Sequence, residues 1–375
     1  MYKLQMVDLA TQYQKIKSEV DTAVISVMES TSFIGGEKVK SFRENLERYL
    51  QVKHVIPCAN GTDALQIAFM ALGLEPGDEV IVPAFTYVAT AEVIALLRLR
   101  PVMVDVDPND FNIDTSALRE AITPRTKAIV PVHLFGQCAN MEEIMRIAEE
   151  YNLFVVEDNA QAIGSDYYFS DGRKQKAGTI GHIGCTSFFP SKNLGCYGDG
   201  GAIFTNDDDL ASKLTMIANH GQSKQYYHDL VGVNSRLDAI QAAILDIKLN
   251  HLDEYAAARR RAADYYDSRF SGHPHILIPA RNNYSTHVFH QYTLRITNGK
   301  RDALKEFLSF NQLPCAIYYP LPLYEQKAFR SFIDEVRPLP VTEILCKEVI
   351  SLPMHTELDP SRQDVVIDKV LEFLN

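Results

Sequence analysis

Short runs of apolar residues alternate, from Val55 to Thr205, with longer segments in which apolar residues recur every three or four positions. Because the short runs are apolar throughout, they predict strands that are buried on both faces. A sheet of such strands needs other elements packed against each of its two faces. The strands expected are Val55–Pro57, Glu79–Pro83, Val102–Val106, Lys127–Val132, Leu153–Glu157, Ile183–Phe189 and Gly201–Thr205.

The longer segments predict amphipathic helices, whose apolar stripes supply that cover. Strands that alternate with helices in this way are typical of α/β proteins. The predicted fold class is therefore a mostly parallel central sheet flanked by helices. The helices expected are Asp8–Glu29, Val39–Leu50, Thr62–Leu72, Val88–Leu97, Thr115–Ile122, Met141–Tyr151 and Asp207–Asn219.

The last third of the chain has a different pattern. The segment from Ser235 to about Phe270 is largely helical and long enough to lead out of the first core. Because 375 residues exceed one ordinary core, we predict a large domain, 1–250, and a smaller C-terminal α/β domain, 251–375. In the smaller domain we expect a lone strand with period-two alternation, a helix, a strand and a final helix, at His290–Thr297, Arg301–Asn311, Cys315–Tyr319 and Gln363–Leu374.

The composition, with 46% apolar and 23% charged residues, is that of a globular protein. A net charge of −11 without a basic run argues against nucleic acid or an anionic membrane as partner, while a phosphorylated ligand remains compatible with it. The chain has no run of about eighteen apolar residues and no signal-peptide pattern at Met1–Asp8, so no membrane span is expected. Six scattered cysteines without a C-x-x-C pair favour the reducing cytoplasm and argue against a structural metal.

Lys192 is the first candidate for chemistry. It follows the strand expected at Ile183–Phe189, which Pro190 should end because proline has no N–H for the ladder. Small residues surround it, including Ser191 and several glycines between Gly195 and Gly201. Open α/β sheets bind ligands outside the carboxyl ends of their strands. Taken alone, however, such a lysine is more often a surface residue in a turn.

A phosphate site is predicted where the strand expected at Val55–Pro57 leads into the helix expected at Thr62–Leu72. Gly61 permits close approach, and the N–H groups of Thr62 and Asp63 begin the helix, whose positive end favours an anion. The alternative is that Asn60 or Thr62 only caps the helix. The glycines do not form a dinucleotide fingerprint, because no G-x-G-x-x-G follows a strand.

Two further strand ends carry an anion and an aromatic ring. Asp158 ends an apolar strand, where a buried carboxylate needs a cationic or N–H partner, such as the ring nitrogen of pyridoxal phosphate (PLP). Tyr87 can lie flat on a planar ring. A turn-capping aspartate and a core tyrosine would explain the same two residues without a ligand. Together with the lysine and the helix start, these residues suggest PLP as cofactor.

Six segments resemble the DegT/DnrJ/EryC1/StrS nucleotide-sugar aminotransferases, and the resemblance covers nearly the whole chain. They are Asn60-Gly-Thr-Asp-Ala-Leu, Pro83-Ala-Phe-Thr-Tyr-Val-Ala-Thr, Glu157-Asp-Asn-Ala-Gln, Thr186-Ser-Phe-Phe-Pro-Ser-Lys-Asn-Leu-Gly, Gly198-Asp-Gly-Gly and Gly232-Val-Asn-Ser-Arg-Leu-Asp-Ala-Ile-Gln-Ala-Ala. Further motifs resemble the UDP-3-oxo-N-acetylglucosaminuronate 3-aminotransferases of bacterial O-antigen synthesis, namely Gly136-Gln-Cys-Ala, the run from Ser191 to Gly201, His220-Gly-Gln and Ser351-Leu-Pro-Met-His.

The resemblance implies a PLP fold-type-I aminotransferase that forms a homodimer with shared active sites and uses glutamate as amino donor. Lys192 would bind the cofactor aldehyde and shuttle the proton, and Asp158 would pair with the ring nitrogen. The other cofactor contacts would come from Gly61, Thr62, Asp63, Tyr87, Gln161, Ser187 and, from the second subunit, Asn234. The keto-sugar nucleotide would be contacted by Arg236, Tyr318 and Tyr319.

Two features depart from the pattern of that family. Asn159 stands where alanine is usual, so the hydrogen bonding of Asp158 is expected to differ, and the segment Tyr167–Gly178 is longer. The sugar stays open among a 3-keto uronate on UDP, a 3-keto-6-deoxyhexose on dTDP and a 4-keto sugar. A uronate would require a cation that the sequence does not single out.

Two different functions also use a PLP site on this fold. One is a sugar dehydratase, which would have histidine in place of Lys192. The other is a non-catalytic PLP-binding regulator, which would be expected to lack part of the set of site residues or to carry a DNA-binding segment. Because the chain has the lysine and the full set of residues, the aminotransferase is the favoured prediction.

Overall fold

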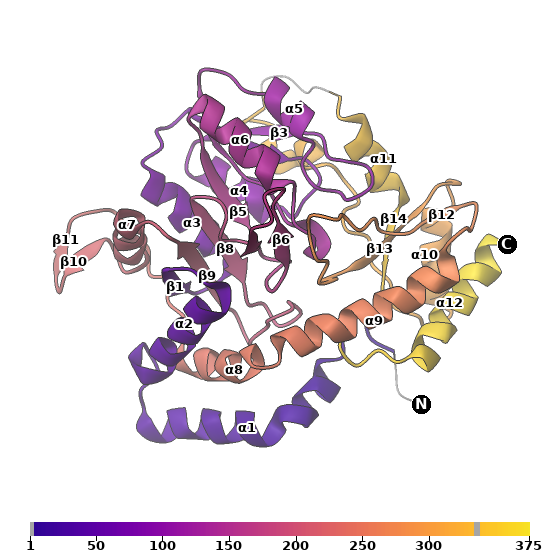
Figure 1. Ribbon diagram of the computed structural model, residues 1–375, viewed down its shortest axis with the longest axis horizontal. Coiled ribbons are helices and arrows are strands. Elements are labelled where there is room, and N and C mark those ends of the chain that lie inside the picture. The colour runs from indigo at the N-terminus through magenta and orange to yellow at the C-terminus, as the bar shows by residue number, and fades with distance from the viewer. Residues whose placement is uncertain (1–3, 334–337) are drawn as a thin grey trace.

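The computed structural model describes residues 4–333 and 338–375, so that the first three residues of the N-terminal segment lie outside it. A seven-stranded sheet, in the order β1-β9-β8-β5-β4-β2-β3, forms the centre of this part of the chain (Figure 1). β9 is antiparallel to both of its neighbours, and every other pair is parallel. The strands are β1 (His54–Cys58), β2 (Glu79–Pro83), β3 (Arg100–Val104), β4 (Thr126–Ile129), β5 (Phe154–Asp158), β8 (Ile183–Ser187) and β9 (Gly201–Thr205).

Helices cover both faces of this sheet, which confirms the predicted α/β class. Consecutive residues of β5 show why the strands are apolar throughout: Val155 packs into one core and Val156 into the other. α3, α4 and α7 lie on the Val156 side, and α5 and α6 lie on the Val155 side. The helices are α1 (Leu9–Ser30), α2 (Gly36–Leu50), α3 (Gly61–Leu72), α4 (Ala89–Leu96), α5 (Thr115–Glu120), α6 (Met141–Tyr151) and α7 (Asp208–Ala218).

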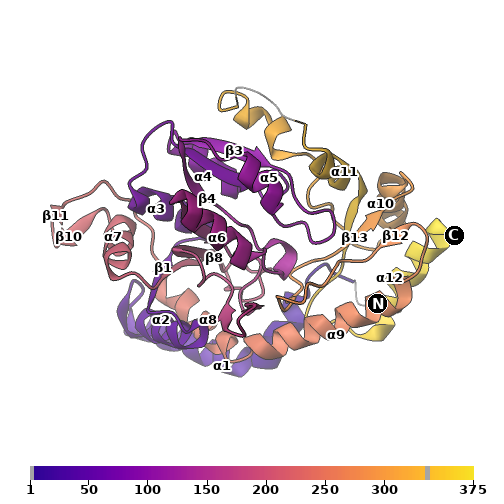
Figure 2. The ribbon, with the colours of Figure 1, turned by 45° about the horizontal axis from the view of Figure 1, so that its top comes forward.

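The predicted helix over Ser235–Phe270 is two helices, α8 (Ala239–Leu249) and α9 (Leu252–Phe270). α8 packs with α1 and α2, and α9 extends from there to the C-terminal elements (Figures 1 and 2). Those elements are a three-stranded antiparallel sheet with three helices, namely β12 (Ile276–Leu277), β13 (Tyr292–Ile296), β14 (Val349–Leu352), α10 (Arg301–Phe310), α11 (Pro340–Glu348) and α12 (Pro360–Leu374).

Two predictions for the C-terminal part are wrong. β13 is not a lone strand but the centre of the small sheet, and because it is buried almost throughout it lacks period-two alternation. Cys315–Tyr319 is not a strand, since only Ala316 forms a bridge, with Ser351. The strand that pairs with β13 on this side is β14.

β8 also ends earlier than predicted, at Ser187 rather than at Phe189 before Pro190. Ser187 pairs with Gly201 at the first residue of β9, and one further bond follows, from the N–H of Phe188 to the carbonyl of Gly200 at 2.7 Å. The chain then folds back on itself, with the Phe188 carbonyl accepting the N–H of Cys196 at 2.8 Å. The chain therefore leaves the ladder at Phe188, two residues before the proline.

Short elements complete the fold and were not predicted. The long Tyr167–Gly178 segment contains the hairpin β6 (Asp166–Tyr168) and β7 (Lys174–Lys176). A second hairpin, β10 (Gln222–Lys224) with β11 (Tyr227–His228), stands out from the body of the molecule at the left of both views. Single 3₁₀ turns lie at Leu134–Gly136, Leu323–Glu325 and Lys327–Phe329.

The apolar clusters bear on the division into domains. One cluster takes its buried members from between Ala262 and Leu374, around β13 and α12. Leu323 and Phe329, however, pack into the core of the seven-stranded sheet. The boundary near residue 250 therefore stays a prediction. Within residues 4–333 and 338–375, no helix combines the length and the apolar character needed to cross a membrane.

Candidate active site

The order of the sheet brings the candidate strand ends to one edge. β1 and β8 are both antiparallel to β9, which lies between them, so they point in the same direction and end on either side of the first residue of β9. Gly201, the first residue of β9, pairs with Cys58 on one side and Ser187 on the other. A Cβ on Gly61 would come within 2.7 Å of the Cβ of Ser187. The loop ends from β1, β8 and β5 therefore surround one position, as open α/β sheets arrange their ligand sites.

Asp158 ends β5 with its carboxylate buried. One oxygen accepts the hydroxyl of Thr90 at 2.8 Å, and the other accepts the N–H of Ala160 at 3.2 Å. Asn159 does not touch this carboxylate; its amide donates to the carbonyl of Ala177 at 2.9 Å. The two neutral donors orient Asp158 and leave its charge to be balanced by a cation.

The cation that faces Asp158 is Lys192, which lies partly buried in the loop after β8. Desolvation lowers the pKa of its amine to about 8, against the opposing field of Asp158, which favours the ammonium. With a pKa near 8, about a tenth of the amine is neutral at pH 7 by the usual titration relation. Such an amine is suited to attack an aldehyde and to carry a proton.

At the start of α3, the predicted helix cap and the predicted anion site coexist. The side chain of Asn60 accepts the N–H of Asp63 at 2.8 Å, so the capping interpretation is correct for Asn60. The N–H of Asp63 is therefore already used. Those of Gly61 and Thr62 have no acceptor within the helix, because the first N–H groups of a helix lack one. Two backbone donors and the hydroxyl of Ser187 are left for a phosphate.

Aromatic and amide groups form a second side of the site. Gln161 is buried; its amide donates to the hydroxyl of Tyr319 at 3.3 Å, and its oxygen accepts the N–H of Phe135 at 2.7 Å. The ring of Tyr319 lies 6.4 Å from that of Tyr87 and 5.9 Å from that of Tyr318. Tyr87 is 58% exposed, so its ring is free to cover a planar ligand rather than being part of the core.

Asn234 and Arg236 lie on the segment that leads into α8, and both are exposed. Between them, Ser235 is buried, and its hydroxyl accepts the N–H of Ala59 at 3.0 Å. The segment is thereby tied behind the turn from β1 to α3. Contacts of Asn234 with a second subunit and of Arg236 with a substrate stay predictions.

Several residues around the site were missed at the sequence level. Thr90 holds Asp158, and its only signal is a polar position within an apolar helix. Glu157 is fully buried and accepts the Nε2–H of His133 at 2.8 Å and the N–H of Gly178 at 2.8 Å. Its signal is a second carboxylate beside Asp158 in a buried strand. This network anchors the loop after β7 against the end of β5.

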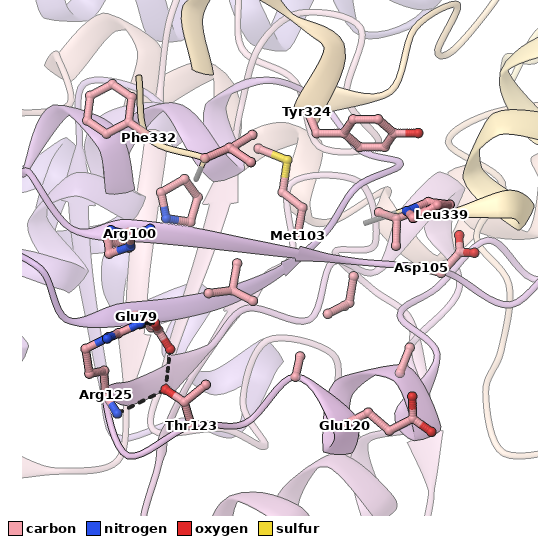
Figure 3. Close-up of a pocket in the computed structure, with 17 residues that line it drawn as sticks. Glu79, Arg100, Met103, Asp105, Glu120, Thr123, Arg125, Tyr324, Phe332 and Leu339 are labelled. Carbon is pink, nitrogen blue, oxygen red and sulfur yellow. Dashed lines mark hydrogen bonds and ion pairs between the residues drawn. The ribbon is translucent and has the colours of Figure 1, made fainter. Parts of the chain in front are cut away.

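A separate cavity of about 450 Å³ lies at the far edge of the sheet, along β3 (Figure 3). Several of its polar groups already have protein partners. Glu79 accepts the hydroxyl of Thr123 and the guanidinium of Arg125, and Asp105 accepts the N–H of Thr342 at 2.8 Å at the start of α11. The cavity has no part in the site described above.

The residues at the site fit PLP. An amine of lowered pKa, an oriented carboxylate, two free N–H groups and an exposed ring correspond to its aldehyde, ring nitrogen, phosphate and ring face. Among the residues that the structure describes, no group of three or more His, Cys, Asp or Glu side chains is placed to hold a metal ion. The expectation of a metal-free site stays a prediction.

Comparison with known proteins identifies full-length relatives. Residues 14–371 match the DegT/DnrJ/EryC1/StrS aminotransferase family. The chain is 46% identical to the UDP-2-acetamido-2-deoxy-3-oxo-D-glucuronate aminotransferase of Pseudomonas aeruginosa, over 97% of this chain and 98% of that protein. It is also 46% identical to a protein of Geobacillus stearothermophilus named pleiotropic regulatory protein, over 98% of each chain.

Solved structures agree with these sequence relatives. The DesV protein of S. venezuelae, in complex with a ketimine intermediate, has a TM-score of 0.94 and 35% identity, with 100% of this chain and 99% of that chain covered. The NtdA protein of Bacillus subtilis, with bound cofactor PMP, has a TM-score of 0.91 and 29% identity, with 100% and 86% covered. The chain belongs to the DegT/DnrJ/EryC1/StrS aminotransferase family and is a PLP-dependent aminotransferase.

Proposed function

We propose that this aminotransferase moves an amino group from glutamate to the 3-keto carbon of UDP-2-acetamido-2-deoxy-3-oxo-D-glucuronate. The P. aeruginosa enzyme named for this substrate is 46% identical over nearly the full length of both chains, which supports the assignment. The single observation that carries the chemistry is the Lys192 amine of lowered pKa facing the oriented carboxylate of Asp158.

When bound, PLP supplies an electrophilic aldehyde and a ring that accepts electrons. The Lys192 amine would hold the cofactor through its aldehyde and, when free, would be placed to take up and return the proton of the donor Cα. Asp158, held by Thr90, keeps the ring nitrogen protonated. The N–H groups of Gly61 and Thr62, with the hydroxyl of Ser187, hold the phosphate.

The remaining assignments concern the ring face, the substrate and the second subunit. Gln161 reaches the phenolic oxygen and Tyr87 covers the ring. Arg236, Tyr318 and Tyr319 contact the nucleotide sugar, and Asn234 acts in the site of a second copy in a homodimer. We place the reaction in the cytoplasm, in O-antigen or lipopolysaccharide synthesis, with neither membrane nor nucleic acid as partner. All six cysteines are free thiols, which supports a reducing compartment.

Two competing functions have their own support. Another keto-sugar nucleotide, such as a dTDP-3-keto-6-deoxyhexose or a 4-keto sugar, fits the same catalytic groups. A PLP-binding regulator without catalysis is favoured by one observation, the 46% identity to the pleiotropic regulatory protein of G. stearothermophilus. These functions and the proposed one differ in which compounds change the cofactor.

The first prediction tests the lysine. Lys192→Ala should abolish both half-reactions while the fold is kept, because it removes the desolvated amine on whose pKa the charge of Asp158 acts. Reduction of the wild-type holoenzyme with borohydride, followed by peptide mass spectrometry, should place the cofactor on Lys192. Lys176→Ala is the control, since Lys176 pairs with Asp166 at 2.9 Å, away from the site. A wild-type rate of cofactor conversion in Lys192→Ala would refute the role.

The same holoenzyme identifies the substrate. Glutamate should shift the cofactor absorbance, and the shifted form should be reversed fastest by the UDP 3-keto uronate among a panel that includes dTDP and 4-keto sugars. Faster reversal by another sugar would replace the substrate assignment. If glutamate and every sugar leave the absorbance unchanged, the regulator function is favoured.

A further inference from the structure

Two side chains of helix α8 make hydrogen bonds to the loop that carries Lys192. We call residues 188–200, between β8 and β9, the lysine loop. Gln241 and Lys248 are seven positions apart on α8, so they lie on the same helical face, about two turns from each other. Both side chains reach the backbone of the lysine loop rather than its side chains.

Gln241 binds both backbone groups of one residue. Its oxygen accepts the N–H of Tyr197 at 2.9 Å, and its amide donates to the carbonyl of Tyr197 at 3.4 Å. The contact is close, because a Cβ on Gly198 would lie 2.9 Å from the same amide nitrogen. Gln241 thus pairs with the backbone of Tyr197 through one acceptor and one donor, as a residue of a neighbouring strand would.

Lys248 binds the loop three residues from Lys192. Its ammonium donates to the carbonyl of Gly195 at 2.5 Å and lies 5.2 Å from the centre of the Tyr197 ring. The side chain is only 1% exposed, and no carboxylate among the described residues pairs with it. Burial lowers the pKa of Lys248 to about 8. A buried cation that has only a carbonyl and a ring as partners contributes poorly to stability, so its place here calls for another explanation.

The other side of the loop is held by separate contacts. The amide of Asn193, next to Lys192, donates to the carbonyl of Val288 at 2.9 Å. The N–H of Lys192 itself donates to the carbonyl of Phe189 at 2.8 Å. Contacts from α8 on one side and from Val288 on the other therefore enclose the position of Lys192.

We propose that Gln241 and Lys248 are positioning residues for Lys192: they hold the backbone of the lysine loop so that the Lys192 amine stays desolvated and faces Asp158. The proposal rests on the proposed role of Lys192. Without the grip of α8 the loop opens to water. The Lys192 amine then regains its hydration, the field of Asp158 weakens, and capture of the cofactor aldehyde slows.

The test uses Lys248→Met and, as a second variant, Gln241→Leu. In the cofactor-free protein, hydrogen exchange of the amides of residues 192–198 should accelerate at least tenfold in each variant, while exchange in β5 stays unchanged. Reconstitution with PLP at pH 7.5 should slow about tenfold, and in the holoenzyme kcat should fall while KM for the sugar stays within twofold. Those magnitudes correspond to the loss of one well-placed hydrogen bond or its equivalent in orientation.

Lys176→Met is the matched control. Lys176 also has a ring and a carbonyl near its ammonium, 4.9 Å to the centre of the Tyr49 ring and 3.4 Å to the carbonyl of Gly164, but it differs from Lys248 in its ion pair with Asp166 at 2.9 Å. This variant should match the wild type in exchange of the lysine loop and in PLP capture. An equal effect from Lys176→Met would mean that any such lysine acts through general stability, and would overturn the proposal.

The remaining outcomes are also decisive. Unchanged exchange at residues 192–198 in the folded α8 variants overturns the proposal, whatever their activity. If Lys248→Met does not fold, Gln241→Leu decides; if neither folds, the pair is structural and the proposal is wrong. Should borohydride reduction place the cofactor on another lysine, the proposed function fails, whereas the exchange measurement still reports on the grip of α8.

Discussion

Burial lowers the pKa of Lys192, and the charge of Asp158 raises it. Loss of hydration favours the neutral amine, and the carboxylate favours the ammonium; the first effect is larger, so the pKa falls to about 8. An unperturbed lysine would be neutral in less than about one molecule in a thousand at pH 7. The lowered pKa raises that fraction by about two orders of magnitude, which is the condition for attack on an aldehyde near neutral pH.

A pH dependence follows from these directions. The rate of PLP capture by the cofactor-free protein should rise about tenfold per pH unit below pH 8 and level off above it, because only the neutral amine attacks. Asp158→Asn removes the charge that raises the pKa, so the plateau should begin at a lower pH. Thr90→Val keeps that charge and removes the 2.8 Å hydrogen bond to Asp158 together with the 3.4 Å contact to the hydroxyl of Thr86, so its plateau should stay near the wild type. The absorbance change after mixing with PLP measures the capture rate of each variant at each pH. A plateau that moves upward in Asp158→Asn would contradict this account.

At the scale of elements, the site depends on how closely the start of α3 approaches the end of β8. Gly61 and Ser187 belong to different elements but share one packing contact, 2.7 Å for an added Cβ. Neither element can move away easily, since β8 is paired on both sides and α3 packs into the main core. A side chain at Gly61 therefore has to push the start of α3 away from Ser187, which separates the backbone donors of the phosphate site from the Ser187 hydroxyl.

We expect Gly61→Ala to weaken PLP binding by at least about fivefold, the effect of an overpacked contact of about 1–3 kcal/mol. Ser187→Gly removes the Cβ that the new methyl group meets, at the cost of one phosphate hydroxyl. The double variant should therefore bind PLP about as well as Ser187→Gly alone. Equilibrium titration of the cofactor-free variants measures the three affinities. If the double variant binds more weakly than both single variants, the two effects are additive and the contact is not their cause.

At the scale of the whole molecule, four of the exposed apolar residues lie close together in sequence, at the end of α1 and just after it. Ile25 and Met28 on α1, with Phe33 and Ile34 after it, are between 45% and 57% exposed. Ile34 forms a bridge with Asp238, close in sequence to Asn234 and Arg236. A dimer through this region would cover the apolar side chains and explain why these two predicted site residues face outward.

Mixing two inactive variants tests the shared site. In a mixed dimer of Lys192→Ala and Asn234→Ala, one site has both defects, and the other has an intact Lys192 with the partner's intact Asn234. An equal mixture should therefore recover about a quarter of the wild-type activity, since half the dimers are mixed and each has one good site. Sedimentation of the wild type checks the dimer itself. No recovery in mixed dimers would mean that Asn234 serves its own subunit.

Which parts were predictable follows from how local their causes are. α3 was placed within one residue, because its cap at Asn60 and its apolar stripe lie within a single segment. β8 was extended too far, because its end depends on where β9 begins. Cys315–Tyr319 was expected to be a strand because it is apolar, but it forms only one bridge, and β14 pairs with β13 instead. Composition alone does not indicate the partner of a strand.

In the candidate site, too, the features with local causes could be predicted and the contacts between distant residues could not. The sequence by itself determined the helices and strands of an α/β fold, and it indicated Lys192 and Asp158 as the amine and the carboxylate, because strand ends and their residue types are local features. Only the tertiary structure decided that Thr90 orients Asp158, that Gln161 meets Tyr319, and that Gln241 and Lys248 hold the lysine loop. Those contacts join residues 44 to 158 positions apart. No periodicity within one element records a neighbour that only the packing of the whole chain supplies.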